Sequence, residues 1–336
     1  MNVEPPPSAV LEHWPIDDAE IEPITFGHIN RTYLVRCSFG RFVLQRVAPI
    51  FGPEIHQDIY TVTRRLLERG VPTPTLVRTE EGQLYVEEDG VWRLQTFAPG
   101  TTYLRVTDSK LAASAATLLA RFHGALSDLD YEFKNTRTGI HDTAKHSAAL
   151  TEALGHHRDH RAYDAVAPLA EDLQRRWGTL GDFSHLPERP VHGDPKISNV
   201  LFDESKHAHC MVDLDTLGRM PVVLELGDAF RSWCNRGDED GEAARFDPEI
   251  FRAAMNAYAQ AAGDTFTAEE RSAVVDGTQT IALELAMRFA ADALNESYFG
   301  WDAQRFESAS AHNLQRARNQ AALAQSIEEQ RAILSP

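Results

Sequence analysis

The chain has 336 residues, of which 43% are apolar and 25% charged, and its formal net charge is −17. This length and apolar content are enough for a large hydrophobic core, which excludes a disordered chain. The strong negative charge repels phosphate backbones, so nucleic acid is not an expected partner and a small-molecule substrate fits better.

The compartment is predicted from the N-terminus and the cysteines. Residues 1–7 lack the basic and apolar regions of a signal peptide, and no apolar run reaches membrane-spanning length. Cys37, Cys210 and Cys234 are widely spaced and odd in number, which indicates neither a disulfide framework nor a thiolate metal site. We therefore expect a soluble cytoplasmic protein without a membrane partner; the sequence predicts no oligomeric state.

The first part of the chain predicts a small antiparallel sheet with one helix. Between residues 21 and 97, β-rich runs at 32–36, 42–47, 84–86 and 92–97 alternate with turn signals such as Asp89-Gly90. Residues 53–70 carry Ile55, Ile59, Val62, Leu66 and Leu67 at helical spacing and stop at Gly70. This helix is expected to pack on the sheet.

After Ala98-Pro99-Gly100 the pattern becomes helical. Residues 108–126 form one apolar stripe, and Thr267 to Glu270 is a capping box that opens a later helix. We therefore predict an α+β fold of two lobes: a sheet lobe over residues 1–98 and a mainly helical lobe over residues 99–336.

The chemistry of the chain is concentrated in His192-Gly193-Asp194-Pro195-Lys196-Ile197-Ser198-Asn199 and the following Val212-Asp213-Leu214-Asp215. Phosphoryl transfer needs few parts: a carboxylate for the acceptor hydroxyl, a cation for the phosphoryl group and oxygen ligands for a metal. This loop supplies them as Asp194, Lys196, Asn199 and Asp213, at the spacing of the protein-kinase catalytic loop. Each fragment alone is typical of a surface turn; together they favour a catalytic site.

Two acidic residues follow the second strand of this motif. If the segment stays extended, Asp213 and Asp215 share one face and both reach a hard cation such as Mg²⁺. Asp213 is the preferred metal ligand because it occupies the place of the metal-binding Asp of kinases, and Asp215 is then a supporting residue. The sequence does not contain G-x-x-x-x-G-K-[ST] or G-x-G-x-x-G, so the P-loop and Rossmann folds are excluded.

With these motifs, the sequence resembles the aminoglycoside phosphotransferase and choline kinase superfamily, and within it the N-acetylhexosamine 1-kinases. Besides the catalytic loop, the resemblance rests on residues 26–33, 42–46, 212–216, 226–228 and 312–318. It implies a two-lobed protein-kinase-like fold that binds ATP and Mg²⁺. It also implies sugar contacts from His28, Asp194, Arg288 and Tyr298.

The nucleotide site is expected in the sheet lobe and at the hinge. Arg46 is the cation that the third strand presents to the phosphates, with Glu54 and Asp58 both open as its acidic partner, and an exposed strand arginine is the alternative. Gln95 and Phe97 mark the hinge, where backbone groups meet adenine and Phe97 forms an apolar wall. Arg288 lies on an otherwise buried helix, so it requires a ligand or a structural ion pair.

Three further segments receive structural interpretations. Asp228 is assigned to tie a helix start to the catalytic loop, and residues 237–242 are expected to form a loop. His156 and His160 have zinc-ligand spacing but no further ligand pattern, so a charged, solvated helix face is favoured.

The leading hypothesis is an ATP- and Mg²⁺-dependent kinase that phosphorylates the anomeric hydroxyl of an N-acetylhexosamine or related sugar. The alternatives are a kinase of another small alcohol, such as an aminoglycoside, choline or a different sugar, and a non-catalytic nucleotide-binding protein of the same fold.

Overall fold

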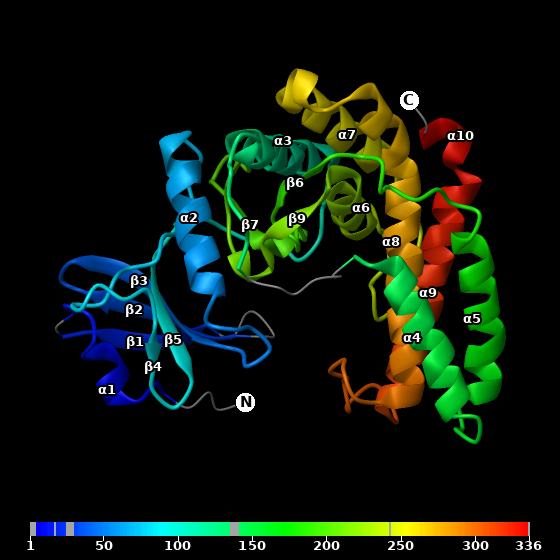
Figure 1. The fold of residues 1–336 in the computed structure, drawn as a ribbon, viewed down its shortest axis with the longest axis horizontal. Helices are drawn as coiled ribbons and strands as arrows, with labels where there is room; N and C mark the ends of the chain where they lie inside the picture. The colour runs from blue at the N-terminus through cyan, green and yellow to red at the C-terminus, as the bar shows by residue number, and fades with distance from the viewer. Residues whose placement is uncertain (1–4, 17, 25–29, 135–140, 242, 335–336) are drawn as a thin grey trace.

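The structure is a computed structural model that describes residues 5–16, 18–24, 30–134, 141–241 and 243–334. Its N-terminal lobe is built on a five-stranded antiparallel sheet in the order β1-β2-β3-β5-β4 (Figure 1). The strands are β1 (Glu20–Ile24), β2 (Arg31–Cys37), β3 (Gly40–Val47), β4 (Val86–Glu87) and β5 (Val91–Thr96). The predicted sheet is confirmed, but β1 was not predicted, because Pro23 interrupts its β-rich character.

One face of this sheet has its own small core. Val10 of α1 (Ser8–Leu11) and Trp14 pack against Tyr33, Leu44 and Trp92. The helix predicted over residues 53–70 is α2 (Ile55–Glu68), which stands between the sheet and the helical part of the molecule (Figure 1). Its buried residues belong to the main core, whereas Leu67, which was expected on the same stripe, is 50% exposed.

The chain crosses between the lobes just after β5. This strand ends at Thr96, and Thr101 already exchanges two backbone hydrogen bonds of 2.9 Å with Phe202 in the C-terminal lobe. The boundary predicted between residues 98 and 99 lies in this short connection.

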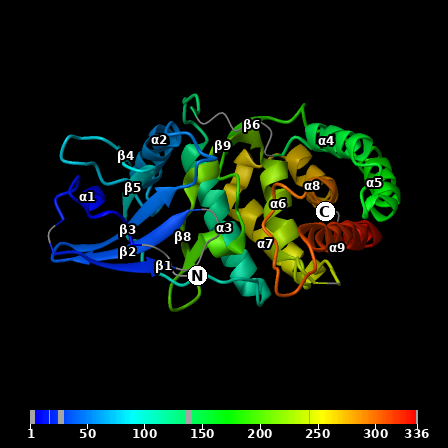
Figure 2. The same cartoon turned by 90° about the horizontal axis from the view of Figure 1, so that it is seen from below.

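The C-terminal lobe is mainly helical, with α8 at its centre, packed against α4, α5, α6 and α9 (Figure 2). Asp108 caps α3 through the Leu111 N–H, and the predicted capping box of Thr267 and Glu270 opens α8. The helices are α3 (Ser109–Leu126), α4 (Thr143–His156), α5 (Tyr163–Trp177), α6 (Val222–Trp233), α7 (Pro248–Ala262), α8 (Ala268–Asn295), α9 (Ala309–Glu329) and α10 (Arg331–Leu334), with 3₁₀ turns η1 (Ile197–Asn199), η2 (Leu214–Thr216) and η3 (Gly263–Thr265).

Two short strand pairs carry the catalytic motif between these helices. They are β6 (Glu188–Val191) with β9 (Gly218–Pro221), and β7 (Val200–Phe202) with β8 (Ala208–Met211). The α+β, two-lobed, protein-kinase-like fold is thus confirmed. Among the described residues, no helix has the length and apolar character needed to cross a membrane.

The histidines of residues 156–160 do not form the helix face that was expected. The α4 helix ends at His156, so the following residues turn away toward α5. His160 instead places its Nε2 3.2 Å from the Glu296 carboxylate at the end of α8.

Candidate active site

The catalytic loop leaves β6 through Gly193, whose backbone has a positive φ of 84°. A Cβ atom at this position would collide with the Thr216 carbonyl of η2. Only glycine satisfies both the left-handed backbone and the close approach. The loop therefore lies directly on the segment that carries Asp213.

His192 is fully buried and acts as a structural residue of the loop. Its Nε2 lies 2.9 Å from the Val212 carbonyl, and its Nδ1 lies 3.3 Å from the backbone N–H of Asp194. A carbonyl only accepts and a backbone N–H only donates, so the ring donates from Nε2 and accepts at Nδ1. His192 thus connects the catalytic loop to the strand before Asp213.

Glu225 of α6, and not Asp228, ties a helix start to the catalytic loop. Its two carboxylate oxygens accept the backbone N–H groups of His192 at 2.9 Å and Gly193 at 3.1 Å, and the side chain is fully buried. Asp228 lies one turn further along α6 and pairs with Arg231 at 2.8 Å. Both acids lie on the same four-residue segment, and no sequence signal distinguishes them.

Asp194, Lys196 and Asn199 are brought together as the sequence predicts. Asp194 Oδ2 accepts from Lys196 Nζ at 2.5 Å and from Asn199 Nδ2 at 3.2 Å. Burial favours the neutral amine, but the Asp194 carboxylate outweighs this effect and raises the pKa of Lys196 above its ordinary value. Asp194 Oδ1 accepts no hydrogen bond from the described part of the chain, so it remains available to an acceptor hydroxyl.

Asp213 and Asp215 do not share one face, because the segment does not stay extended. Asp213 has a left-handed backbone with φ 67°, and Asp215 lies in the 3₁₀ turn that follows. Asp215 is buried against Arg93 of β5, 2.5 Å away. Burial and the Asp215 charge raise the pKa of Asp213. The Arg93 guanidinium opposes the effect of burial and holds the pKa of Asp215 below its ordinary value.

The oxygens of Asn199 and Asp213 fit a hard divalent cation. The amide nitrogen of Asn199 donates to Asp194, and its Oδ1 accepts no hydrogen bond within the described ranges. The Asp213 carboxylate likewise receives none from the residues that the structure describes, although the residue is only partly buried. Unsatisfied carboxylate and amide oxygens are the donor set that Mg²⁺ prefers.

Arg46 lies apart from this group. Alternation along β3 places it on the face of Leu44 and Trp92, where its guanidinium pairs with Asp89 at 3.3 Å. The acidic partner is therefore in the β4-β5 turn and is neither Glu54 nor Asp58. Asp58 instead accepts from the Tyr131 hydroxyl and the Lys134 N–H.

The other face of the sheet carries Gln45 and Arg93, which are direct cross-strand partners. On this face Arg93 reaches the C-terminal lobe through Asp215, and the sequence interpretation missed this role. Period-two alternation could have shown that Gln45 and Arg46 point to opposite faces. Which face meets the second lobe was not evident from the sequence.

The hinge residues lie where the chain crosses between the lobes. Gln95 is the penultimate residue of β5, and Phe97 follows the strand. The Phe97 N–H donates to the Arg41 carbonyl at 3.3 Å, and the Arg41 guanidinium lies 4.3 Å from the centre of the Phe97 ring. The adenine contacts assigned to these residues stay a prediction.

Arg288 lies on α8, and Tyr298 lies just after the end of this helix. The Arg288 guanidinium lies 5.7 Å from the Phe299 ring centre, and no carboxylate of the described residues is within ion-pair distance. Tyr298 is 60% exposed. Asp292 of α8 fixes the start of the loop that carries Tyr298 by accepting the N–H groups of residues 297–299. His28 lies outside the described residues.

Two charge pairs feel the charges of Arg288 and of Lys196 in the catalytic loop. His141 pairs with Glu284 at 3.0 Å; burial favours its neutral form, but the carboxylate raises its pKa, and Asp228 and Arg288 also act on it. Burial likewise opposes the charge of Asp228, yet Arg231, His141 and Lys196 hold the pKa of Asp228 low. These charged groups therefore act on one another electrostatically, from Arg288 to Lys196.

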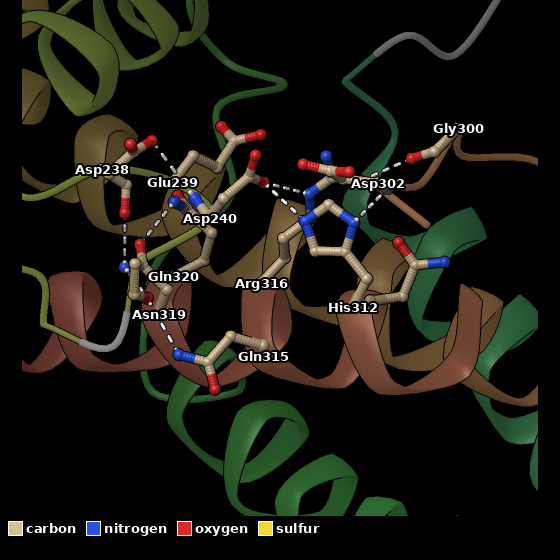
Figure 3. A network of polar contacts seen from close by, with 12 residues as sticks. Asp238, Glu239, Asp240, Gly300, Asp302, His312, Gln315, Arg316, Asn319 and Gln320 are labelled. Carbon is tan, nitrogen blue, oxygen red and sulfur yellow. Dashed lines mark hydrogen bonds and ion pairs between the residues drawn. The ribbon is translucent and has the colours of Figure 1, made fainter. Parts of the chain in front are cut away.

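The loop of residues 237–241 is held firmly against α9 (Figure 3). Asp240 accepts from His312 at 2.9 Å and Arg316 at 2.5 Å, and Asn319 donates to two loop carbonyls. Glu239 of the same loop pairs with Arg231 at 3.2 Å. The predicted loop is therefore fixed to α9 and, through Glu239, to Arg231 of α6.

A cavity of about 610 Å³ lies on the flank of the N-terminal lobe, lined by residues that include His56, Arg78 and Tyr85. Neither Asp194 nor Asp213 lines it. This cavity does not belong to the site, because the catalytic groups lie elsewhere.

Two lobes joined by a short hinge, with a catalytic loop that groups an aspartate, a lysine and an asparagine, define a phosphotransferase of the protein-kinase-like class. The model of the phosphotransferase enzyme family matches residues 20–264, more than half of the chain. The chain therefore belongs to this family and transfers a phosphoryl group to an alcohol of a small molecule.

Solved structures with this fold cover nearly the whole chain. The amicoumacin kinase hAmiN in complex with AMP-PNP, Ca²⁺ and Ami has a TM-score of 0.64 and 12% identity, over 96% of this chain and 92% of that chain. An aminoglycoside phosphotransferase from Alicyclobacillus acidocaldarius has a TM-score of 0.64 and 17% identity, over 98% of this chain and 97% of that chain. A microcompartment-associated aminopropanol kinase has a TM-score of 0.64 and 14% identity, over 98% of both chains.

Proposed function

We propose that this phosphotransferase is an ATP- and Mg²⁺-dependent kinase that phosphorylates the anomeric hydroxyl of an N-acetylhexosamine or a related sugar. The observation that carries the proposal is the acceptor side of the site. There the carboxylates already have partners, whereas Arg288 has no ion pair among the described residues and Tyr298 is 60% exposed.

Asn199 and Asp213 hold the metal, and residues 95–97 meet the nucleotide base. The bound cation neutralises charge on the phosphates during transfer. The structure of hAmiN with AMP-PNP and Ca²⁺ supports the use of a nucleotide with a divalent metal.

Asp194 Oδ1 accepts the proton of the acceptor hydroxyl as the hydroxyl oxygen forms its bond to the γ-phosphorus. The bond between the γ-phosphorus and the bridging oxygen breaks, and ADP leaves with its electron pair. Lys196, held 2.5 Å from the other Asp194 oxygen, offsets charge on the transferring group. Closure of the two lobes excludes water, which limits hydrolysis of ATP.

The charge of the acceptor side favours a neutral, hydroxyl-rich molecule. Asp228 is paired with Arg231, and Glu284 with His141 and Thr143. A site for a cationic amino alcohol is expected to keep a carboxylate for the ammonium group. Arg288 instead offers donors to hydroxyl and acetamido oxygens, and Tyr298 offers a flat apolar surface.

A kinase of an amino alcohol is the second candidate, because aromatic rings also bind cations. Tyr298 is 60% and Trp301 41% exposed, and the aminopropanol kinase shares the fold. A non-catalytic nucleotide-binding protein is the third, and the joint presence of Asp194, Lys196, Asn199 and Asp213 argues against it. The use of ATP and the three unpaired cysteines support a cytoplasmic location.

The test is ATP consumption with Mg²⁺ across N-acetylhexosamines, neutral hexoses and amino alcohols, with phosphorus NMR of each product. A sugar 1-phosphate is the expected product. Turnover only with an amino alcohol keeps the phosphotransferase chemistry but overturns the sugar assignment. Metal-dependent ATP binding without transfer to any acceptor supports the binding-protein alternative.

A further inference from the structure

A buried ion pair joins the two lobes immediately beside the proposed metal ligand. Arg93 Nη1 on β5 lies 2.5 Å from Asp215 Oδ1 on η2, and the two side chains are 1% and 2% exposed. β5 belongs to the sheet lobe, while η2 follows the strand that leads to Asp213. The pair therefore reaches from the nucleotide lobe to within two residues of the metal site.

Each of the three guanidinium nitrogens of Arg93 donates a hydrogen bond within the protein, and the side chain is only 1% exposed. Its Nε and Nη2 both donate to Gln45 Oε1, at 2.9 and 2.7 Å, and its Nη1 is used by Asp215. Gln45 in turn donates to Thr32 Oγ1 on β2 at 3.2 Å. Three strands of the sheet thus fix the guanidinium, and its burial keeps it from a nucleotide in this arrangement.

Asp215 is fixed equally well from the other side. Its Oδ2 accepts from Asn30 Nδ2 at 2.6 Å, and Asn30 Oδ1 accepts the Ala48 N–H at 2.9 Å. Asn30 and Ala48 belong to the sheet lobe, as does Arg93. The sheet lobe therefore holds both carboxylate oxygens of Asp215, although the backbone of this residue belongs to the catalytic segment.

The position of Asp213 depends on this anchor. No described residue donates a hydrogen bond to the Asp213 carboxylate, so its backbone alone sets where it points. That backbone is left-handed, and it is held on the C-terminal side by Asp215 and by Thr216, whose Oγ1 donates to the His192 carbonyl at 2.9 Å. A change at Asp215 must therefore be transmitted to Asp213.

We infer that Arg93 and Asp215 are positioning residues that couple the sheet lobe to the divalent metal bound with the nucleotide. The inference rests on the metal role of Asp213 in the proposed function. Residues that orient a metal ligand without touching the metal typically change metal affinity about 10- to 100-fold when they are replaced. When either residue is replaced, the divalent cation should bind more weakly in the nucleotide complex, and the affinity for the acceptor should not change.

The test compares the double variant Arg93→Met/Asp215→Asn with Arg65→Met. The double variant removes both charges, so that neither is left buried and unpaired, and the new amide oxygen can still accept from Asn30. Arg65 on α2 also bridges the lobes, through Asp128 at 2.5 Å. Within the described part of the chain, neither residue of that pair forms a hydrogen bond or ion pair with the segment that carries Asp213. Arg65→Met therefore controls for the loss of an inter-lobe ion pair as such.

The readout is binding and not turnover: calorimetric titration of a non-hydrolysable ATP analogue at fixed free Mg²⁺ concentrations and in EDTA. We expect unchanged analogue affinity in EDTA, and a Mg²⁺ requirement raised about tenfold in the double variant, as for other residues behind a metal ligand. Arg65→Met should keep the wild-type requirement. Arg93→Lys keeps the charge but loses the fork of donors, so an intermediate requirement is expected and decides the question if the double variant does not fold.

A wild-type Mg²⁺ requirement in the folded double variant, or in Arg93→Lys when only that variant folds, would overturn the inference. An equal increase in Arg65→Met would also overturn it, because lobe linkage alone would then explain the effect. Failure of the proposed function is distinguishable: wild-type protein would then bind the analogue without any dependence on Mg²⁺, or would phosphorylate no sugar while its metal dependence remained intact.

Discussion

The carbonyl of Thr216 stands where a Cβ atom on Gly193 would have to lie. Gly193 lies in the catalytic loop, next to Asp194. Thr216 lies in η2, which directly follows Asp213. The missing side chain at Gly193 therefore sets the distance between the proposed base and the proposed metal ligand.

Gly193→Ala is expected to lower kcat by about 10²-fold, because displacement of catalytic groups by about 1 Å has that order of effect. The left-handed backbone adds a strain of roughly 1 kcal/mol for alanine. The measurements are steady-state kinetics and urea unfolding. Gly124→Ala, within α3 and without any atom near the added methyl, is the control and should match or exceed wild-type stability. Full activity of Gly193→Ala would contradict the geometry.

Asp194→Asn should lower kcat by at least about 10²-fold, the usual contribution of a general base, and leave the fold intact. The amide still accepts from Lys196 and Asn199 through one oxygen, so the loop keeps its shape. Turnover with the best acceptor and a thermal unfolding curve measure the two effects. A fully active Asp194→Asn protein would remove Asp194 as the base.

Glu225→Gln is expected to destabilise the protein by about 1 to 3 kcal/mol, the usual cost of leaving a buried donor unsatisfied. The new amide nitrogen must face one of the two backbone N–H groups that the carboxylate now accepts. Free energies of unfolding from urea titration provide the measurement. Glu152→Gln on the exposed face of α4 is the matched control, with an expected change within about 0.5 kcal/mol. Equal stability of the two variants would rule out the role of Glu225.

The catalytic loop was the part of the site that could be predicted from the sequence, because its chemistry is local. Asp194, Lys196 and Asn199 are close together in the chain, and one loop conformation brings their side chains together. Strand alternation and a capping box are also local patterns, so the sheet lobe and α8 were predicted as well.

Contacts between distant segments were not predictable in this way. The partner of Asp215 is Arg93, 122 residues away, and only the docking of the lobes brings them together. The partner of Arg46 was not predicted either, because this acidic residue, Asp89, lies in a neighbouring turn and not on α2. The choice between Glu225 and Asp228 depended on the orientation of α6, which four residues of sequence cannot define.

His56 should make the protein less stable in mild acid. Burial, assisted by the Arg93 charge, lowers the pKa of His56 from 6.5 to about 4. Below pH 6.5 the unfolded chain takes up a proton that the folded chain refuses until about pH 4, so stability falls as the pH falls through this window. Between about pH 7.5 and 5.0 the loss is about 2 kcal/mol for this one group.

Urea unfolding of wild type and His56→Leu at both pH values tests this, since the packing cost of leucine cancels in the difference between pH values. Wild type should lose about 2 kcal/mol more than His56→Leu, by the linkage of protonation to folding. His207→Gln alters an exposed histidine and should leave the wild-type loss unchanged. Identical pH dependence in wild type and His56→Leu would show that His56 titrates normally.

Arg288→Met tests the acceptor assignment most directly. The guanidinium has no ion pair among the described residues and lies 5.7 Å from the Phe299 ring centre, so its hydrogen-bond donors remain for a ligand. Loss of a charged hydrogen bond is worth about 1.5 to 3 kcal/mol, which raises the KM for the sugar roughly 10- to 100-fold. The KM for ATP should not change, because the proposed nucleotide site lies at the hinge.

The matched control is Arg271→Met, which removes an arginine of the same helix that also lies over a phenylalanine, Phe266, at 5.9 Å. Arg271 is exposed near the start of α8, far along the helix from Arg288, so its loss should leave both KM values unchanged. An unchanged sugar KM in Arg288→Met would assign Arg288 a structural role, and an equal rise in both variants would point to the helix as a whole. A rise confined to Arg288→Met and to the sugar places the acceptor against this arginine.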